Sequence, residues 1–384
     1  MSWCHLRRIY WCESLKWDIK SPIIESKCPN KTQKMSQLTY RQRKIVDFIA
    51  SRESTQNQDV VDFLKKEGNP VTRKTVMREL FDLVVADHIV KTGQGRGVSY
   101  KAKIVHHLLK PIDHESYFNK GQDERLPQRT PFNHEVIDKL QNIFSANELA
   151  EISMKNEVYL ERRARLSDTI VKKELERLII ELAWKSSKIE GNSYSLFETD
   201  ALISEHTEAS GHSREEAVMI LNHKKAFDYI LANKEKFSLI SVREIENVHR
   251  LLVDGLGVNH GIRNIPVGIR GTNYIPLDNP VSIKDALERT VAEINKAKDP
   301  WTRSLLSLMM IAYIQPFEDG NKRTSRMIAN ACLIAGNACP LSLRSVDVME
   351  YKKAITLFYE IQNITLLKKM FQEQVDFSVK NYFR

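Results

Sequence analysis

The chain contains one short polar segment whose residue types suit the binding of phosphate groups. An apolar stretch, Leu305 to Ile314, runs directly into it, and residues 327–335 continue apolar after it. Between the two stretches lie three residues whose backbone N–H groups can form a concave nest at the start of a helix: Gly320, Asn321 and Lys322. The positive end of the helix dipole favours an anion at this point. The segment therefore predicts an anion site between two buried helices.

Charged side chains around this nest narrow the expected ligand to a polyphosphate. Arg323 and Arg326 are three residues apart, so both lie on one face of the predicted helix, where they can contact several phosphate oxygens. Asp319 stands just before the nest, and its carboxylate is suited to hold a divalent metal that bridges phosphate oxygens.

The run from Ile314 to Arg326, Ile-Gln-Pro-Phe-Glu-Asp-Gly-Asn-Lys-Arg-Thr-Ser-Arg, resembles the signature loop of Fic domains. That loop reads His-Pro-Phe-x-Asp/Glu-Gly-Asn-x-Arg-x-x-Arg, and every defined position matches except the first, where Gln315 replaces the histidine. A second match lies upstream, where Ser186-Ser-Lys-Ile-Glu190-Gly191-Asn192 fits the family's inhibitory pattern Ser/Thr-x-x-x-Glu-Gly/Asn. The resemblance covers about residues 168 to 360.

This resemblance implies transfer of AMP from ATP, with Mg²⁺, to a Ser, Thr or Tyr hydroxyl of a target protein. Asn321 and the loop N–H groups would hold the α-phosphate, while Arg323 and Arg326 would orient the β- and γ-phosphates. Glu190, paired with Arg326, would block productive placement of the γ-phosphate. Restrained proteins of this family also self-associate, which makes a homodimer an expected assembly.

A stretch rich in glycine and proline, residues 261–280, interrupts the helical pattern. Two short extended pieces within it, 267–270 and 273–275, predict a hairpin. In the family such a flap aligns the target segment as an added strand. The resemblance gives it four residues: Arg263, Val267, Ile269 and Tyr274. Beyond the loop, Tyr351 is expected either to stack on an adenine or to pack in the core, and His249 to be a packed or capping histidine.

Gln315 leaves three interpretations open, because an amide cannot take a proton near neutral pH and loss of a general base commonly costs about 10²–10⁴ in rate. In the first, the site is a nucleotide sensor with weak or no transfer, which couples ATP occupancy to the winged helix of a transcription regulator. In the second, it is an enzyme in which Glu190 or a water is the base, and Glu190 could also direct a water at an AMP–protein bond. In the third, Gln315 is an engineered inactivating change. All three retain nucleotide binding.

Residues 36 to 110 carry 14 Lys/Arg and 8 Asp/Glu, an excess of 14 − 8 = +6 out of +9 for the whole chain. Three short helical patterns, about 40–51, 58–66 and 72–86, precede two short extended pieces around the glycine-rich turn 93–97. This order resembles a winged helix-turn-helix. The expected contacts to double-stranded DNA are Arg73, Lys74, Thr75 and Arg78 on the third helix and Arg96 in the wing. The alternative is a protein–protein module with a solvated charged surface.

The whole sequence predicts a mostly α protein: a helical Fic core with a β-hairpin flap, preceded by an α+β winged helix. The expected boundaries are a disordered tail or extension at 1–35, the winged helix at 36–103, a connector at 104–134, and the Fic domain with its inhibitory helix at 135–384. No apolar run approaches the ~18 residues of a membrane helix. Residues 1–34 lack a signal-peptide core, and the five cysteines show no CxxC pair or disulfide framework, so a cytoplasmic protein without membrane partners is expected.

Overall fold

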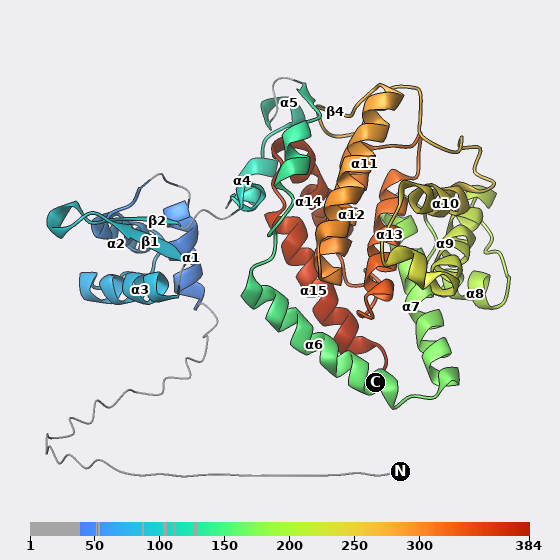
Figure 1. The fold of residues 1–384 in the computed structure, drawn as a ribbon, viewed down its shortest axis with the longest axis horizontal. Helices are drawn as coiled ribbons and strands as arrows, with labels where there is room; N and C mark the ends of the chain where they lie inside the picture. Colours follow the sequence, from blue (N-terminus) through green and yellow to red (C-terminus); the bar gives the residue numbers. More distant parts are fainter. Residues whose placement is uncertain are drawn as a thin grey trace, which may run out of the picture.

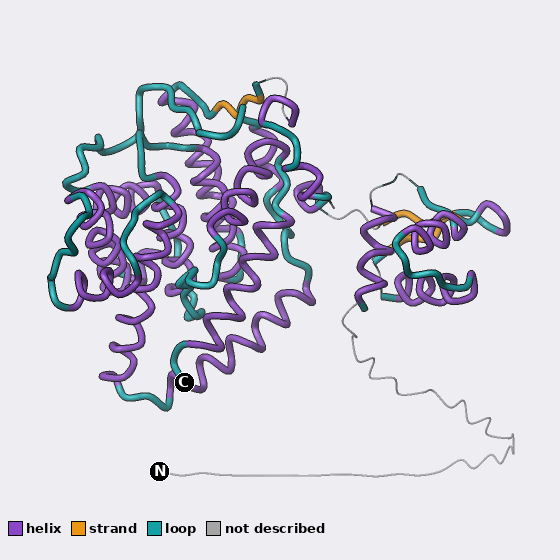
Figure 2. Tube along the Cα trace, turned by 180° about the vertical axis from the view of Figure 1, so that it is seen from behind, coloured by secondary structure: helices purple, strands orange, loops and turns teal. Residues whose placement is uncertain are grey.

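The computed structural model describes residues 39–50, 52, 54–86, 88–102, 106–110, 112–125 and 129–384. The tail expected at residues 1–35 lies outside this part. The described chain is mostly helical, as predicted, with four short strands among many helices (Figures 1 and 2). Within it, no helix combines the length and the apolar character that a bilayer crossing requires.

The first unit consists of three helices followed by an antiparallel hairpin, in the order that the sequence predicts. Its elements are α1 (Tyr40–Ala50), α2 (Asn57–Lys66), α3 (Arg73–Val85), β1 (Ile89–Thr92) and β2 (Ser99–Ala102). Thr72 caps α3 by accepting the N–H of Thr75 at 3.3 Å. Ile89 lies opposite Ala102 in the hairpin, and one face of each helix closes on a core of its own around Leu80.

The second unit is a helical bundle. Its helices are α4 (His114–Phe118), α5 (Gln122–Arg125), α6 (Ala146–Ala164), α7 (Asp168–Ile189), α8 (Leu196–Ser204), α9 (Arg214–Ala232), α10 (Val242–Val253), α11 (Pro280–Lys296), α12 (Pro300–Ile314), α13 (Asn321–Ala335), α14 (Val348–Ile361) and α15 (Thr365–Asn381). In Figure 1, α6 and α15 lie side by side, as do α11 and α12.

Helix α12 is the centre of this bundle, because every residue from Trp301 to Ile314 is buried. It begins at Asp299, whose side chain accepts the N–H of Thr302 at 2.7 Å, and Pro300 occupies the first turn. It packs along α13, so the polar loop between these two helices is held at both ends by the core. The loop is thereby fixed on a rigid base.

The flap differs from the predicted hairpin. Residues 267–270 form no strand, and β4 (Tyr274–Ile275) pairs in parallel with β3 (Thr130–Pro131), with Thr130 opposite Tyr274. The 261–280 segment is therefore attached to the residues before α6 instead of folding on itself. Tyr274 is buried, and its hydroxyl donates to the carbonyl oxygen of Tyr313 at 2.7 Å, which anchors the strand on α12.

Candidate nucleotide site

A cavity of about 240 Å³ opens at the N-terminus of α13. Its walls come from the end of α7, from α9, from the flap segment and from the loop between α12 and α13. The lining residues are Glu190, Met219, Val267, Gly268, Ile269, Arg270, Gln315, Glu318, Asp319, Gly320, Asn321, Lys322 and Arg323. The structure thus brings the predicted anion nest, the predicted inhibitory glutamate and part of the predicted flap to one place.

Gly320 makes the sharp turn into α13. Its φ is +79°, and a Cβ there would lie 2.8 Å from Cγ1 of Val253, so only glycine fits both the backbone and the space. The N–H groups of the first helical turn have no partner within the helix. They begin at Asn321 and border the cavity, as an anion nest requires.

The side chains of Asn321 and Gln315 hold the loop in shape. The Asn321 amide accepts the N–H of Phe317 and donates to its carbonyl oxygen, both at 2.8 Å, and also donates to Oε1 of Gln315 at 3.1 Å. Gln315 has a left-handed backbone, with φ 53°, and its Nε2 donates to the carbonyl of Ala312 at 2.6 Å. The Gln315 amide is therefore engaged by the protein on both sides.

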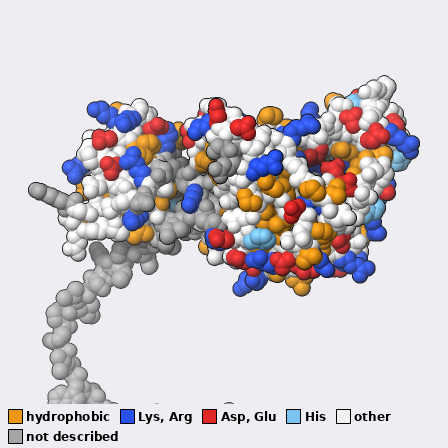
Figure 3. Space-filling model, turned by 90° about the horizontal axis from the view of Figure 1, so that it is seen from above, with side chains coloured by type: hydrophobic (Ala, Val, Ile, Leu, Met, Phe, Trp, Pro, Cys, Tyr) orange, Lys and Arg blue, Asp and Glu red, His pale blue; other side chains and the backbone are white. Residues whose placement is uncertain are grey.

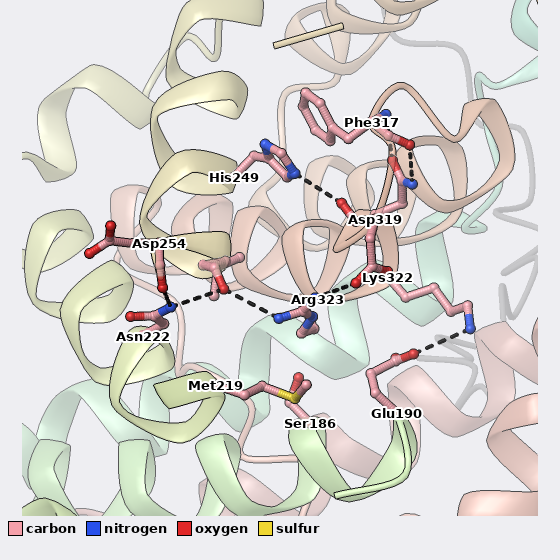
Figure 4. Close-up of polar contacts among 12 residues, drawn as sticks. Ser186, Glu190, Met219, Asn222, His249, Asp254, Phe317, Asp319, Lys322 and Arg323 are labelled. Carbon is pink, nitrogen blue, oxygen red and sulfur yellow. Dashed lines mark hydrogen bonds and ion pairs between the residues drawn. The ribbon is translucent and has the colours of Figure 1, made fainter. Parts of the chain in front are cut away.

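His249 of α10 supports the loop from behind. Its ring stacks on that of Phe317, with the two ring centres 3.7 Å apart. Its Nε2–H donates to the carbonyl oxygen of Asp319 at 2.9 Å (Figure 4). Burial lowers the pKa of His249 to about 4, so the ring is neutral at pH 7. It is a packed histidine, which is the interpretation that its position in the sequence favours.

Arg323 points along the floor of the site between α10 and the loop. Its NH2 donates to Oδ2 of Asp319 at 2.9 Å and its NH1 to the carbonyl of Leu252 at 3.3 Å, a carbonyl that Asn222 also reaches (Figure 4). Burial lowers the pKa of Arg323, but it keeps its charge beside the cavity.

Arg326 and Glu190 form the predicted ion pair. NH2 of Arg326 lies 2.7 Å from Oε1 of Glu190, and Lys322 reaches Oε2 of the same carboxylate at 3.3 Å (Figure 4 shows the lysine contact). Burial alone would raise the pKa of Glu190, but the charges of Arg326 and Lys322 outweigh it and lower the pKa to about 2. Glu190 is an anion that already occupies the cationic side of the cavity.

Ser186 completes this pair from one helical turn before Glu190. Its hydroxyl oxygen accepts Nε–H of Arg326 at 2.9 Å, and its own hydrogen is directed to Nε2 of His223 at 2.8 Å. His223 donates its Nδ1–H to the carbonyl of Met219, and burial lowers the pKa of His223 to about 3, which keeps Nε2 an acceptor. The buried NH1 of Arg326 has no partner among the described residues.

The other residues of the predicted inhibitory motif shape the turn after α7. Gly191 has φ +102°, a conformation that favours glycine, and it leads the chain away from α13. Asn192 donates to the carbonyl of Glu216 at 2.9 Å and accepts the N–H of Tyr194 at 3.0 Å, which attaches this turn to α9. They contribute to the position of Glu190 and do not line the cavity.

The four predicted flap residues divide into two pairs. Val267 and Ile269 line the cavity. Arg263 is buried beneath the flap, where Nε donates to the carbonyl of Gln315 at 2.7 Å and the other nitrogens donate to the carbonyls of Ile265 and Leu277. Arg263 thus attaches the flap to the loop, and Tyr274 attaches it to α12.

Tyr351 does not line the cavity. It is buried behind Arg326, whose guanidinium lies 5.6 Å from the ring centre. This location favours the packing role that the sequence leaves open beside adenine stacking.

Sequence reasoning missed four lining residues, Met219, Gly268, Arg270 and Glu318. Arg270 and Glu318 lie inside segments that the motifs already mark, and their charge is a signal that could have found them. Met219 comes from α9, and nothing in its sequence context indicates that it faces the loop.

A family model described as "Fic/DOC family" matches residues 239–333, which include α10, the flap, α12 and the polar loop. Over these residues the chain is similar to the Fic/DOC family. A protein adenylyltransferase Fic from Nematostella vectensis is 27% identical over 190 residues, which are 47% of this chain and 43% of that protein. One from Culex quinquefasciatus is 26% identical over 193 residues, 48% of this chain and 38% of that protein. The chain thus spans less than half the length of these relatives.

A solved structure supports the Fic fold over most of the chain. Fic-1 from C. elegans superposes with a TM-score of 0.53 at 14% identity, covering 90% of this chain and 99% of that one. At this identity the match concerns the fold alone.

Proposed function

We propose that this chain is a Fic-type nucleotide-binding protein, an ATP-dependent protein adenylyltransferase restrained by Glu190. The observation that carries the proposal is the ion pair of Glu190 with Arg326, 2.7 Å long, at a cavity that the Fic loop lines. The names of the curated relatives, protein adenylyltransferase Fic, support the reaction class.

The binding roles follow from the cavity. The N–H groups at the start of α13 would hold the α-phosphate, and Arg323 with Arg326 the β- and γ-phosphates. The cavity, about 240 Å³, is smaller than the ~300–1,000 Å³ of typical ligand pockets, and Glu190 competes with phosphate for the same cations. Nucleotide binding would therefore require Glu190 to leave Arg326.

The residues present fit a magnesium ion bound together with ATP. The carboxylate of Asp319 is largely exposed beside the cavity, and its second oxygen is not engaged by Arg323. Among the described residues no three His, Cys, Asp or Glu side chains cluster as a metal site. One carboxylate suffices for Mg²⁺ when phosphates and water supply the other ligands. When bound, the ion would neutralise charge on the phosphates.

Gln315 decides how much transfer the site supports. Its amide is held by Ala312 and Asn321, and an amide nitrogen has no basic lone pair with which to accept the hydroxyl proton. Gln315 therefore orients Asn321. Transfer would be slow, by about 10²–10⁴ relative to a histidine at this place, unless another base such as Glu190 takes over.

The test follows α-³²P-ATP with Mg²⁺ on the chain as it stands, on Glu190→Gly and on Gln315→His, measuring both bound nucleotide and covalent label on protein. Glu205→Gly removes a glutamate at the end of α8, outside the cavity lining, and is the matched control. We expect nucleotide binding to rise in Glu190→Gly and in the double variant Glu190→Gly/Gln315→His, but not in Gln315→His or Glu205→Gly. Label should rise most in the double variant. Absence of binding in Glu190→Gly would refute the nucleotide site.

Label in Glu190→Gly with Gln315 in place would identify a restrained transferase. Binding without label until Gln315→His is added would identify a nucleotide sensor.

A second candidate is a DNA-binding regulator whose Fic domain senses nucleotide. The exposed Arg73, Lys74 and Arg78 of α3 support it, with Thr75 half-buried beside them, whereas the Arg96 side chain lies outside the described part of the chain. Against it, Met77 and Phe81 are exposed on the same helix, at 52% and 66%. On the face of the molecule seen in Figure 3, Lys and Arg side chains are interspersed with Asp and Glu, so this face offers no continuous basic surface to DNA.

The test of this candidate is retention of duplex DNA by the full chain and by Arg73→Glu/Lys74→Glu. We expect the double variant to abolish retention if α3 enters a groove, because it replaces two positive charges by two negative ones. Unchanged retention in the double variant would refute this use of α3.

A further inference from the structure

Helix α7 presents a second polar face beside the one that carries Ser186. Glu174, Arg177, Glu181 and Lys185 recur at intervals of three or four residues and so form one stripe along the helix. None of them belongs to the cavity lining. All four contact segments far along the chain, from the loop before α14 or from residues 381–383. The stripe is therefore a connection between α7 and those segments.

Glu181 is the centre of this stripe, and it is buried. Oε1 accepts NH1 of Arg344 at 2.8 Å, and Oε2 accepts the hydroxyl of Tyr382. The Tyr382 hydroxyl also lies 2.6 Å from Oγ of Ser342. A buried carboxylate with two specific donors is held in one position, because losing either donor leaves charge without a partner in a region that excludes water.

Residues 381–383 contact α7 through backbone atoms as well. NH2 of Arg177 donates to the carbonyl of Asn381 at 2.6 Å, and the N–H of Phe383 donates to Oε2 of Glu174 at 2.9 Å. Phe383 is fully buried with φ 54°, a left-handed conformation that is costly for a bulky residue. The contacts to α7 and the core hold it there. We call Asn381–Phe383 the latch.

The loop before α14, residues 341–346, contacts Glu181 and Lys185 of α7 and is also hydrogen-bonded to α13. Nζ of Lys185 donates to the carbonyl of Val346 at 2.9 Å. At the other end of the loop, Leu341 exchanges two hydrogen bonds with the side chain of Asn330 on α13, at 2.7 and 3.0 Å. One loop thus connects α7, which carries Glu190, with α13, which carries Arg326.

We propose that the latch and the 341–346 loop position α7 so that Glu190 pairs with Arg326, with Tyr382 and Glu181 as the positioning residues. Release of the latch would loosen the last turns of α7 and move Glu190 away from Arg326. The consequence for ATP rests on the proposed function, whereas the mechanical connection does not. A ligand or partner that displaces residues 381–383 would relieve the restraint without touching the cavity.

The experiment is amide hydrogen exchange of residues 186–192 in the full chain and in Tyr382→Phe. This change removes one hydroxyl and keeps the ring that packs against Arg177. The matched control is Tyr117→Phe. The hydroxyl of Tyr117 donates to buried Glu360, and Arg125 contacts the same carboxylate. This arrangement is equivalent to that of Tyr382 and Arg344 around Glu181. We expect exchange to be about tenfold faster or more in Tyr382→Phe, the size of one lost hydrogen bond to a charged group, and unchanged in Tyr117→Phe.

Unchanged exchange in Tyr382→Phe, or equal acceleration in both variants, would overturn the proposal. Lys185→Met provides a second approach, since it removes the contact to Val346 and should also accelerate exchange of residues 186–192.

ATP affinity, measured by calorimetry, separates this inference from the proposed function. If both hold, Tyr382→Phe binds ATP several-fold more tightly than the unchanged chain, in the same direction as Glu190→Gly. If Glu190→Gly binds no ATP, the proposed function fails, and the exchange result still decides the latch.

Discussion

Glu190 and its two cations determine the electrostatics of the site at the scale of single residues. Arg326 is fully buried and bound on one side by Ser186, whereas Lys322 is about one-third exposed and more distant from the carboxylate. Solvent screens the lysine contact more than the arginine contact. The ion pair of Glu190 with Arg326 therefore contributes most of the attraction that holds Glu190 in the site. Removing Glu190 without supplying another anion would leave the buried charge of Arg326 unpaired and destabilise the fold.

Acidification should weaken this pair in a defined pH range. The pKa of Glu190 is about 2 in the fold, below its usual value near 4.5, so its stabilisation is present above about pH 5 and is lost as the pH falls toward 2. The shift corresponds to at most about 3 kcal/mol in the free energy of unfolding. We expect urea denaturation at pH 5, 4 and 3 to show a steeper loss for the unchanged chain than for Glu190→Gln. Parallel curves would contradict the pairing.

Two buried histidines extend the pH dependence to milder acid. The pKa of His249 is about 4 and that of His223 is about 3, both below the usual 6.5. Between pH 7 and 5 both histidines therefore become protonated in the unfolded chain but stay neutral in the folded chain. Stability should fall by about 2 kcal/mol per histidine over this range. His249→Gln keeps a hydrogen-bond donor for the carbonyl oxygen of Asp319. It should remove about half of the loss in unfolding free energy between pH 7 and 5. The exposed His206→Gln is the control, and a loss of slope in it as well would exclude this origin.

At the scale of elements, the turn from α12 into α13 depends on one glycine. Gly320→Ala combines a positive φ with a Cβ at 2.8 Å from Val253, whereas Gly257→Ala has a similar φ, +69°, and no atom within 4 Å. We expect Gly257→Ala to cost about 1–2 kcal/mol from backbone strain alone. Gly320→Ala should cost more and should also weaken nucleotide binding, measured by chemical denaturation and filter binding. Equal costs would show that Val253 moves aside.

Helices of the second unit were predictable because local signals define them. Two examples are α7 (Asp168–Ile189) and α10 (Val242–Val253). Ser167 and Ser241 cap these helices through their side chains, which is a signal within four residues of the helix start. Periodic apolar residues then fix how far each helix extends.

Strand pairing in the flap was not predictable in the same way. The sequence shows that 273–275 is extended, but nothing local indicates that its partner is Thr130–Pro131, some 140 residues earlier. The nearer piece, 267–270, is the natural guess because short loops favour hairpins. The hydrogen bonds of the predicted hairpin are absent from this segment. The buried Arg263 holds it in place instead, by donating to three backbone carbonyls.

The candidate site was predictable where its residues are consecutive in the sequence. The loop from Gln315 to Arg326 is one motif, and Glu190 is reached because a second motif names its partner. Met219 and the latch residue Tyr382 come from elements whose sequences carry only core periodicity. Their relation to the site arises from packing between distant helices, which composition and spacing do not encode.

At the scale of the whole molecule, the described chain has separate hydrophobic cores. One core joins α1, α2, α3 and the hairpin around Leu80, and another joins the helices around α12, including Ile311. Both residues are fully buried. Because each core closes on itself, each unit should unfold as its own cooperative transition.

Core substitutions test this separation in the full chain. Leu80→Ala and Ile311→Ala each remove a buried aliphatic side chain, at a cost of about 2–5 kcal/mol in their own unit. We expect calorimetry to resolve two transitions, with Leu80→Ala lowering the midpoint of one and Ile311→Ala that of the other. ATP added to Glu190→Gly should raise only the transition that Ile311→Ala lowers, because ligand stabilises the unit that binds it. A single transition that both substitutions lower would contradict this separation and would mean that the two units unfold together.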